Sequence, residues 1–436
     1  MGAWFRDRVV NRMFKNAAYL LSGDLLASAM RMITIALTAR ALGVDNFGIL
    51  VLLQTYVAVI DRIVNFQSWQ ALIKFGAEHR AREKREPLED IFKLGFLIDL
   101  STALIGAIVA ASLARWAGSW LQWSHIVVEY AVFYSAVIAF NIEGTCIAVL
   151  RLHDKFGLLG GQKVIAAGVK LIATVIAFAT TDSLLVFVGL AAICQVIGYL
   201  VLIGISFWQL HRLKLKPVRQ GSAAQAMREN KGIMNYIVTT NLHATFRMIP
   251  DQLDFLIVSF VLGNAATGIY KVAKETARIL TRLVQPLYQS IYPELTRLSA
   301  AKQYAKLFQV VRRSSVMVGM VSFGFWICLI LFGEYVLALV FGAQYTDGYT
   351  VLVWYALGAA ISAAAFPITP AILAVGLPRL SLFAIVISTI LYLICLPILM
   401  QHFDLSGAGM ANVILYVSWA IIVAVAGTFL WRRRIE

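Results

Sequence analysis

The chain has 436 residues, of which 60% are hydrophobic and only 14% are Asp, Glu, Lys or Arg, and its mean hydropathy is +0.78. A soluble globular domain is nearer to about 45–50% apolar and about 25% charged, so this composition excludes an ordinary soluble protein. A net charge of +15 is common in nucleic-acid-binding proteins, but the basic residues here are distributed as membrane topology requires, which excludes nucleic acid as a partner.

Long apolar segments predict an all-α polytopic membrane protein, because a helix needs roughly 20 apolar residues to cross the hydrocarbon core. Transmembrane barrel strands are about ten residues long and alternate in character, so they do not fit these continuous runs. The sequence predicts about twelve transmembrane helices, at residues 17–39, 47–70, 91–113, 126–149, 158–180, 184–208, 237–261, 268–291, 314–332, 350–376, 380–400 and 408–431.

The basic residues predict the orientation. If the amino terminus lies inside, 26 of the 38 Lys and Arg residues fall on that same side, in the tail up to residue 15, in 74–90, 151–157, 209–231, 292–313 and 432–434, and at Arg379. The opposite loops hold only Arg40 and Arg115. Because Lys and Arg are retained in the cytoplasm, we predict a multi-pass protein with both termini cytoplasmic.

The opening hairpin of the chain is repeated near the middle. Three features recur at an offset of 220 residues: Leu42-Gly43 with Leu262-Gly263, Gly48 with Gly268, and Arg62 with Arg282. This offset is close to half of the chain length. We therefore predict two pseudo-symmetric six-helix halves, 1–220 and 221–436, joined through the basic linker HRLKLKPVRQGSAAQAMRENKG. Repeats of this kind are common in transporters, whose substrate path lies at the repeat interface.

Charges inside the predicted spans are the candidate functional residues, because ionisable groups at bilayer depth are costly and face a bundle interior or a wet cavity. Cations are in excess among them: the bases are Arg31, Arg62, Lys163, Lys170, Arg247, Lys271, Lys274, Arg278 and Arg282, and the acids are Asp24, Asp61, Asp251, Asp254 and Glu275. The four bases from Lys271 to Arg282 are spaced 3, 4 and 4 residues apart, which predicts one helix face.

An excess of cations in a low dielectric predicts an anionic ligand, and Arg and Lys together suit phosphate. The predicted substrate-binding cavity is lined by Arg31, Arg62, Lys170, Arg247, Lys271, Lys274, Arg278 and Arg282. The candidates for coupling transport to H⁺ or Na⁺ are Asp24, Asp61, Asp251, Asp254 and Glu275. The alternative is that these charges pair with one another and hold helices together, which applies most to Asp251, Asp254 and Glu275.

Motifs for catalysis are absent from the sequence. There is no GxxxxGK[ST], HExxH or GxSxG, so ATP hydrolysis, zinc proteolysis and serine hydrolysis have no support. The four cysteines lie far apart and form no CxxC pair, so neither a disulfide framework nor a metal site is indicated. We expect a protein that is not an enzyme, with no catalytic residues, no cofactor and no metal.

Six segments, in their order and spacing, resemble the polysaccharide-transporter branch of the multidrug/oligosaccharidyl-lipid/polysaccharide (MOP) exporter superfamily, the Wzx-type O-antigen and exopolysaccharide flippases. They are TARALGVDNFGIL, PDQLDFLIVSFVLGNAATGIYKVA, SIYPELTRL, FGEYVLALVFGAQY, AILAVGLPR and DLSGAGMANVI. The resemblance implies a MOP/MATE-like fold with a cationic central cavity. It also implies that undecaprenyl-pyrophosphate-linked oligosaccharide repeat units are moved across the bacterial inner membrane by alternating access, for O-antigen, exopolysaccharide or capsule synthesis.

The expected partners are the lipid-linked glycan, membrane lipids and other polysaccharide assembly proteins. Three alternatives stay open at this point. A multidrug or cation antiporter of the same superfamily would have a cavity dominated by carboxylates, which the basic excess disfavours. A membrane glycosyltransferase or polymerase is disfavoured by the short external loops. A scaffold within a polysaccharide assembly complex is compatible with the sequence.

Overall fold

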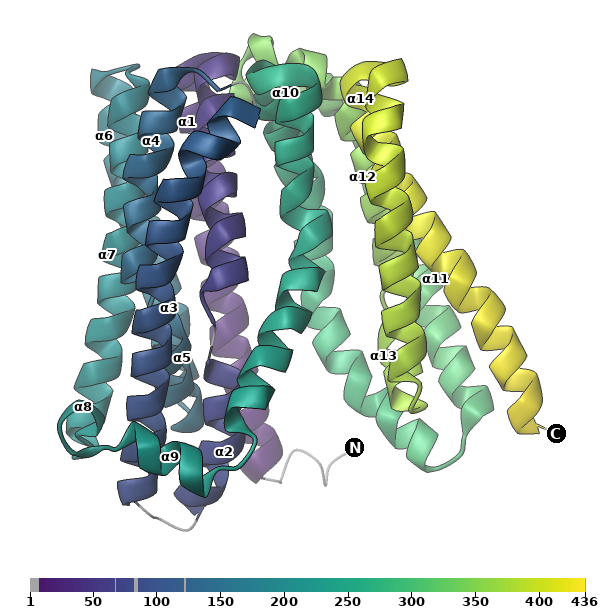
Figure 1. The fold of residues 1–436 in the computed structure, drawn as a ribbon. Helices are drawn as coiled ribbons and strands as arrows, with labels where there is room; N and C mark the ends of the chain where they lie inside the picture. Colours follow the sequence, from purple (N-terminus) through teal and green to yellow (C-terminus); the bar gives the residue numbers. More distant parts are fainter. Residues whose placement is uncertain (1–7, 67, 82–84, 121–122, 436) are drawn as a thin grey trace. The chain divides into compact units, whose positions relative to one another are not determined.

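The computed structural model describes residues 8–66, 68–81, 85–120 and 123–435, and all the regular elements in these ranges are helices (Figure 1). Nine helices of the described chain are long and apolar enough to cross a membrane. Helices suit the interior of a bilayer because lipid offers no hydrogen-bond partners to the backbone, and a helix satisfies its own backbone groups. Large apolar side chains such as Ile108, Val321 and Leu331 are 66–69% exposed, as expected of surfaces that contact lipid. The chain is a multi-pass membrane protein of the predicted all-α class.

Three of the long helices contain a break in the helical backbone. The breaks lie at Gly43 in α1 (Arg8–Val64), at Gly263 in α10 (Ile233–Ala300) and at Phe403 and Asp404 in α14 (Pro378–Ile435). Each of these helices therefore consists of two arms, and the arms correspond to pairs of predicted spans. The total of twelve spans stays a prediction.

Two predicted spans are interrupted. The predicted span 47–70 ends at Val64, and the chain bends before it resumes as α2 (Trp69–Ala81). The predicted span 126–149 is divided into α4 (His125–Ser135), the short 3₁₀ helix η2 (Ala136–Phe140) and α5 (Glu143–Leu152).

The two interruptions contact each other through side-chain amides. Asn65 Nδ2 donates to the backbone oxygen of Asn141 at 2.9 Å, and Asn141 Nδ2 donates to Asp61 Oδ2 at 2.7 Å. The Asn65 amide thus supplies a partner for a backbone carbonyl at the second interruption, which helps the breaks to be tolerated within the apolar environment.

The described chain forms two compact units. The first unit comprises the chain up to Leu42 together with Leu53–Gln252. Besides the elements above it contains α3 (Arg85–Trp120), α6 (Phe156–Thr180), α7 (Leu184–Arg212), α8 (Pro217–Gln220) and α9 (Ala223–Glu229). Part of its core is formed by Cys146, Leu150, Leu159 and Leu202, which join α5, α6 and α7.

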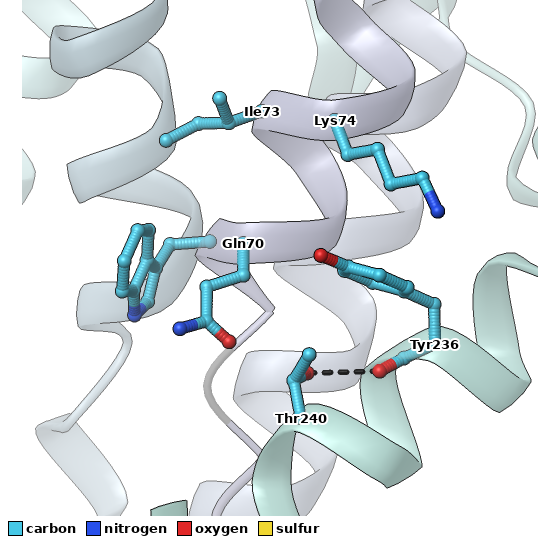
Figure 2. A pocket seen from close by; sticks show the side chains of 6 residues that line it. Gln70, Ile73, Lys74, Tyr236 and Thr240 are labelled. Atoms are coloured by element: carbon cyan, nitrogen blue, oxygen red, sulfur yellow. Dashed lines mark hydrogen bonds between the residues drawn. The ribbon is translucent and has the colours of Figure 1, made fainter. Parts of the chain in front are cut away.

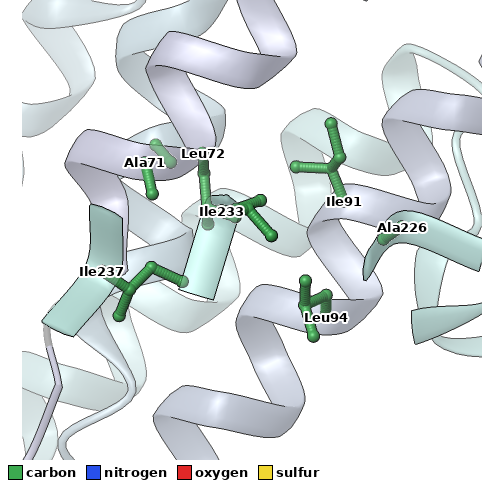
Figure 3. Packing of buried hydrophobic residues seen from close by; sticks show 8 residues of the cluster. Ala71, Leu72, Ile91, Leu94, Ala226, Ile233 and Ile237 are labelled. Carbon is green, nitrogen blue, oxygen red and sulfur yellow. The ribbon is translucent and has the colours of Figure 1, made fainter. Parts of the chain in front are cut away.

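The predicted linker is anchored to the first unit. Glu89 Oε1 accepts the backbone N–H of Lys216 at 2.7 Å, and Asp90 Oδ1 accepts the backbone N–H of Ser222 at 2.5 Å. Figure 3 shows a buried apolar cluster that joins α9 and the start of α10 to α2, α3 and α5, formed by Ala71, Leu72, Ile91, Leu94, Ala148, Ala226, Ile233 and Ile237. The first compact unit thus extends to Gln252, beyond the linker. The two halves 1–220 and 221–436 were predicted from the sequence repeat and not from compactness, so they remain a prediction.

The second unit comprises Gly43–Leu52 and Leu253–Glu436. Its further helices are α11 (Tyr304–Phe341), η3 (Ala343–Gly348), α12 (Tyr349–Ala364) and α13 (Ile368–Ala374). A core of Leu280, Val318, Ala359, Ala360 and Ala363 joins α10, α11 and α12. The small alanines allow the helices to approach closely, which is how helices associate without help from a hydrophobic effect in lipid.

Two matched glycine turns meet within the second unit. Gly43 and Gly263 have φ angles of +70° and +87°, a left-handed conformation that glycine adopts without steric cost. Gly48 lies so close to Asn264 that an added Cβ would be 1.8 Å from the Asn264 carbonyl oxygen, and a Cβ on Gly268 would be 2.5 Å from the carbonyl oxygen of Val44. The offset of 220 residues relates these two contacts to each other, so the repeat in the sequence reappears as a repeat in backbone conformation.

We expect Gly48→Ala and Gly268→Ala each to destabilise the protein by about 1–3 kcal/mol, the usual cost of overpacking, because backbone rather than a flexible side chain occupies the space. The measurement is the thermal unfolding midpoint of the purified protein in detergent. Gly204→Ala and Gly324→Ala are matched controls, because an added Cβ would meet nothing within 4 Å at either position. Equal midpoints for all four variants would contradict the close crossing.

Candidate functional site

The clearest concentration of charge lies on the second arm of α10. Glu275 accepts a hydrogen bond from Lys271 Nζ at 3.0 Å and another from Arg282 at 2.5 Å, and Arg278 Nη1 lies 3.8 Å away. Lys271 lies four residues before Glu275, and Arg278 and Arg282 lie three and seven residues after it. These spacings place all three bases on the same side of the helix as Glu275. We call Lys271, Glu275, Arg278 and Arg282 the Glu275 cluster.

The Glu275 cluster carries two positive charges in excess. The carboxylate side chain is only 6% exposed, whereas the three bases are 23–33% exposed. The bases therefore reach outward from a carboxylate that holds them in place. A partly exposed group of Arg and Lys in a low dielectric is suited to bind a phosphate or carboxylate.

Lys274 has a different environment from the other three predicted bases. It is fully buried, and its ammonium group forms an ion pair with Asp254, which also accepts a hydrogen bond from Tyr270 Oη at 2.7 Å. The rings of Phe255, Tyr270 and Tyr355 surround the ammonium, with centroids 4.5–5.7 Å from Nζ. The predicted single basic face is thus divided, because Asp254 on the first arm supplies a partner for Lys274 inside the bundle.

The predicted charges of the first unit lie in separate local contacts. Lys163 Nζ donates to Asp24 at 2.6 Å, and both side chains are more than 40% exposed. Arg31 donates to Ser28 Oγ at 2.7 Å. Asp61 accepts amide hydrogen bonds from Asn65 and Asn141, as described above.

The remaining predicted residues are Arg62, Lys170, Arg247 and Asp251. Arg62 and Lys170 are partly buried, and Asp251 is exposed. The backbone carbonyl of Arg62 accepts from Thr245 Oγ1 at 3.2 Å. The side chain of Arg247 lies outside the described part of the structure. The binding and coupling roles of all the predicted residues stay predictions.

A buried carboxylate network was not among the predicted site residues. Asp99 is 1% exposed, and its Oδ2 accepts both the backbone N–H and the hydroxyl of Thr145 at 2.6 Å. Its second oxygen lies near Gly144, at the start of α5. The signal in the sequence is a single acidic residue, Asp99, within the apolar predicted span 91–113.

A groove lined by both apolar and polar side chains was also missed. It lies between α2 and the first arm of α10, has a volume of about 460 Å³, and is lined by Trp69, Gln70, Ile73, Lys74, Tyr236 and Thr240 (Figure 2). We call it the α2–α10 groove. Its aromatic residues are 167 positions apart in sequence, so no local pattern could have joined them.

A family model and two related proteins match this chain over most of its length. The model of the family described as polysaccharide biosynthesis protein matches residues 13–299. The inner membrane protein YghQ of Escherichia coli is 21% identical over 354 residues, which cover 80% of this chain and 98% of YghQ. The probable low-salt glycan biosynthesis flippase Agl15 of Haloferax volcanii is 20% identical over 402 residues, covering 91% of this chain and 80% of Agl15.

Solved structures share the fold. The lipid II flippase MurJ in an inward closed conformation superposes with a TM-score of 0.75 at 15% identity, covering 94% of this chain and 87% of MurJ. An inward-facing multidrug resistance transporter of the MATE family, in the MOP superfamily, gives a TM-score of 0.70 at 13% identity, covering 93% and 94% of the two chains. The predicted MOP/MATE-like fold is confirmed.

Proposed function

Because this chain belongs to the family of polysaccharide biosynthesis proteins, we propose that it is a flippase for a lipid-linked oligosaccharide. The substrate class is an undecaprenyl-pyrophosphate-linked repeat unit, moved across the bacterial inner membrane by alternating access. The name of Agl15 as a glycan biosynthesis flippase and the fold shared with the lipid II flippase support a lipid-linked glycan as the substrate at a coarser level. Transport of this kind makes and breaks no bond in the substrate, so the protein acts as a transporter and not as an enzyme.

The observation that carries the proposal is the cationic excess of the Glu275 cluster. The diphosphate between lipid and sugar is the most concentrated charge of such a substrate, and it must leave water to cross the bilayer. Three bases held by one buried carboxylate are positioned before the ligand arrives, so little ordering is required when it binds. The lipid tail can remain in the bilayer throughout.

A multidrug or cation antiporter is the second candidate, because a MATE transporter shares the fold. A cationic drug would be repelled by the Glu275 cluster, in which bases outnumber acids by three to one. Coupling to H⁺ or Na⁺ through Asp24, Asp61, Asp251, Asp254 or Glu275 remains part of the proposal in either case.

The test uses a deletion strain. We expect complete undecaprenyl-pyrophosphate-linked repeat units to accumulate facing the cytoplasm, so that a glycosidase reaches them in inverted vesicles but not in intact spheroplasts. Truncated units would indicate a glycosyltransferase, and units stranded on the outer face would indicate a polymerase. If no glycan accumulates and the strain becomes sensitive to cationic dyes, the protein is a drug antiporter.

We expect Arg278→Gln to reduce export roughly 10- to 100-fold, which corresponds to the loss of a charge-assisted hydrogen bond worth about 1.5–3 kcal/mol. Arg278 lies farther from Glu275 than Lys271 and Arg282 do, so those two still neutralise the carboxylate and the protein should accumulate normally. Export is measured as surface glycan in the complemented deletion strain. Arg312→Gln, at an exposed position on α11, is the control. Wild-type export by the Arg278 variant would exclude the cluster as a diphosphate site.

A further inference from the structure

The α2–α10 groove is separate from the Glu275 cluster in sequence and in its chemistry. All six lining residues belong to the first unit, and its volume of about 460 Å³ falls within the range of about 300–1,000 Å³ found for small-molecule sites. Figure 2 shows Gln70 and Lys74 on α2 facing Tyr236 and Thr240 on α10. The groove also adjoins the segments 74–90 and 209–231, which carry basic residues predicted to face the cytoplasm.

Aromatic rings and cations are paired along this groove. Lys74 Nζ lies 4.1 Å from the centroid of the Tyr236 ring, and the guanidinium carbon of Arg151 lies 4.4 Å from the centroid of the Trp69 ring. The Nε of Arg151 is buried and has no hydrogen-bond partner among the described residues. Lys74 is exposed and has no carboxylate partner in the described ranges. The groove thus offers two aromatic rings and the charge of Lys74, while Arg151, which is not a lining residue, lies beside the Trp69 ring.

These groups suit a sugar that carries an anionic group. One face of a pyranose ring presents C–H groups and packs on an aromatic ring, while its hydroxyls need donors and acceptors at the edge. Gln70 supplies an amide there. The Thr240 hydroxyl donates to the Tyr236 carbonyl at 2.9 Å, and its oxygen can still accept. Lys74 is positioned to meet a phosphate beside the ring.

We propose that the α2–α10 groove binds a glycosyl phosphate, with its sugar stacked on Trp69 and Tyr236 and its phosphate near Lys74. The proposal rests on the flippase function and assigns its glycan-recognition site to the cytoplasmic end of the first unit. Of the two sources of glycosyl phosphate in a cell, a lipid-linked glycosyl diphosphate and a soluble nucleotide sugar, the membrane location favours the first.

The test measures binding to the full-length protein in nanodiscs. The probes are farnesyl diphosphate linked to glucose, galactose or N-acetylglucosamine, with farnesyl diphosphate and UDP-N-acetylglucosamine for comparison. We expect at least one sugar-bearing probe to bind more tightly than farnesyl diphosphate. That gain should fall roughly five- to tenfold in Tyr236→Ala, whereas Lys74→Gln should weaken the sugar-bearing probes and farnesyl diphosphate alike, because all of them carry the phosphate.

Two matched controls should leave the dissociation constants unchanged. Trp208→Ala removes another aromatic ring that lies beside a cation, since the guanidinium carbon of Arg212 is 4.9 Å from the centroid of the Trp208 ring, and Lys306→Gln removes another exposed lysine. The thermal midpoint of each variant shows that it is folded, and Tyr236→Phe, which keeps the ring, should retain the gain.

Three outcomes would overturn the proposal. They are no gain from any sugar, a gain that survives Tyr236→Ala, and an affinity for the phosphate-bearing probes that Lys74→Gln leaves unchanged. Tighter binding of UDP-N-acetylglucosamine than of the lipid-linked probes would overturn the lipid-linked source. The flippase function is tested separately, by glycan accumulation in the deletion strain. The binding proposal for the groove can therefore be wrong while the flippase proposal is correct, and the flippase proposal can be wrong while the groove binds the probes.

Discussion

Replacing Lys274 by Met is expected to destabilise the protein by about 3–5 kcal/mol, because the substitution leaves Asp254 charged and buried without its counter-ion. Both side chains are at most 1% exposed, so no water can replace the lost ammonium. Two tyrosine hydroxyls would remain near the carboxylate, at 2.7 Å for Tyr270 and 3.4 Å for Tyr392, and neither carries a compensating charge. The loss should appear as a lower thermal midpoint and less protein in the membrane.

The double variant Asp254→Asn with Lys274→Met distinguishes a buried charge from a general packing defect. The amide keeps an acceptor for Tyr270 but carries no charge, so most of the lost stability should return. Lys306→Met, at an exposed position, should have little effect. If the double variant is no more stable than Lys274→Met alone, the ion pair is not the reason for the loss.

The second large effect is expected at Glu275. Changing it to Gln leaves Lys271, Arg278 and Arg282 around a neutral amide, and their mutual repulsion in a partly buried site should cost about 3–5 kcal/mol. Glu294→Gln is the matched control. Its Glu294–Arg297 pair has a distance of 2.7 Å but is 43–63% exposed, and pairs so exposed contribute about 0–1 kcal/mol.

A second substitution tests the cause of the Glu275 effect. Glu275→Gln combined with Arg282→Gln removes one cation along with the carboxylate, so the stability of the membrane protein should partly return while export remains low. Thermal midpoints and surface glycan are measured on the same set of variants. Full export by Glu275→Gln at normal protein levels would show that the bases need no anchor, and would contradict the organisation of the Glu275 cluster.

The helices and the hairpin turns could be predicted from the sequence for clear physical reasons. Apolar runs of bilayer length allow only helices, and the paired Leu-Gly turns mark where helix direction must change. The left-handed glycines Gly43 and Gly263 lie at these turns. The Glu275 cluster was also predictable in part, because its members are three, four and seven residues apart on one helix and need no knowledge of the tertiary fold.

The partners of the remaining charges depend on tertiary contacts that spacing does not encode. Lys271 and Lys274 are one turn apart, yet one joins Glu275 and the other joins Asp254, twenty residues earlier. The breaks after Val64 and before Glu143 were missed because they depend on a hydrogen bond between residues 76 positions apart, from the Asn65 side chain to the Asn141 backbone oxygen. The α2–α10 groove depends on a similar long-range contact, between Lys74 and Tyr236.

The glycine crossing of the second unit carries information about ancestry. In a two-fold symmetric dimer, residue i of one subunit contacts residue j of the other, and j contacts i in return. Gly48 with Asn264 and Gly268 with Val44 follow this rule once 220 is subtracted from the larger numbers. The crossing therefore has the form of a homodimer interface preserved inside one polypeptide, as gene duplication and fusion would leave it. In a dimer of chains half this length one glycine would serve at both positions, whereas here Gly48 and Gly268 can be changed independently.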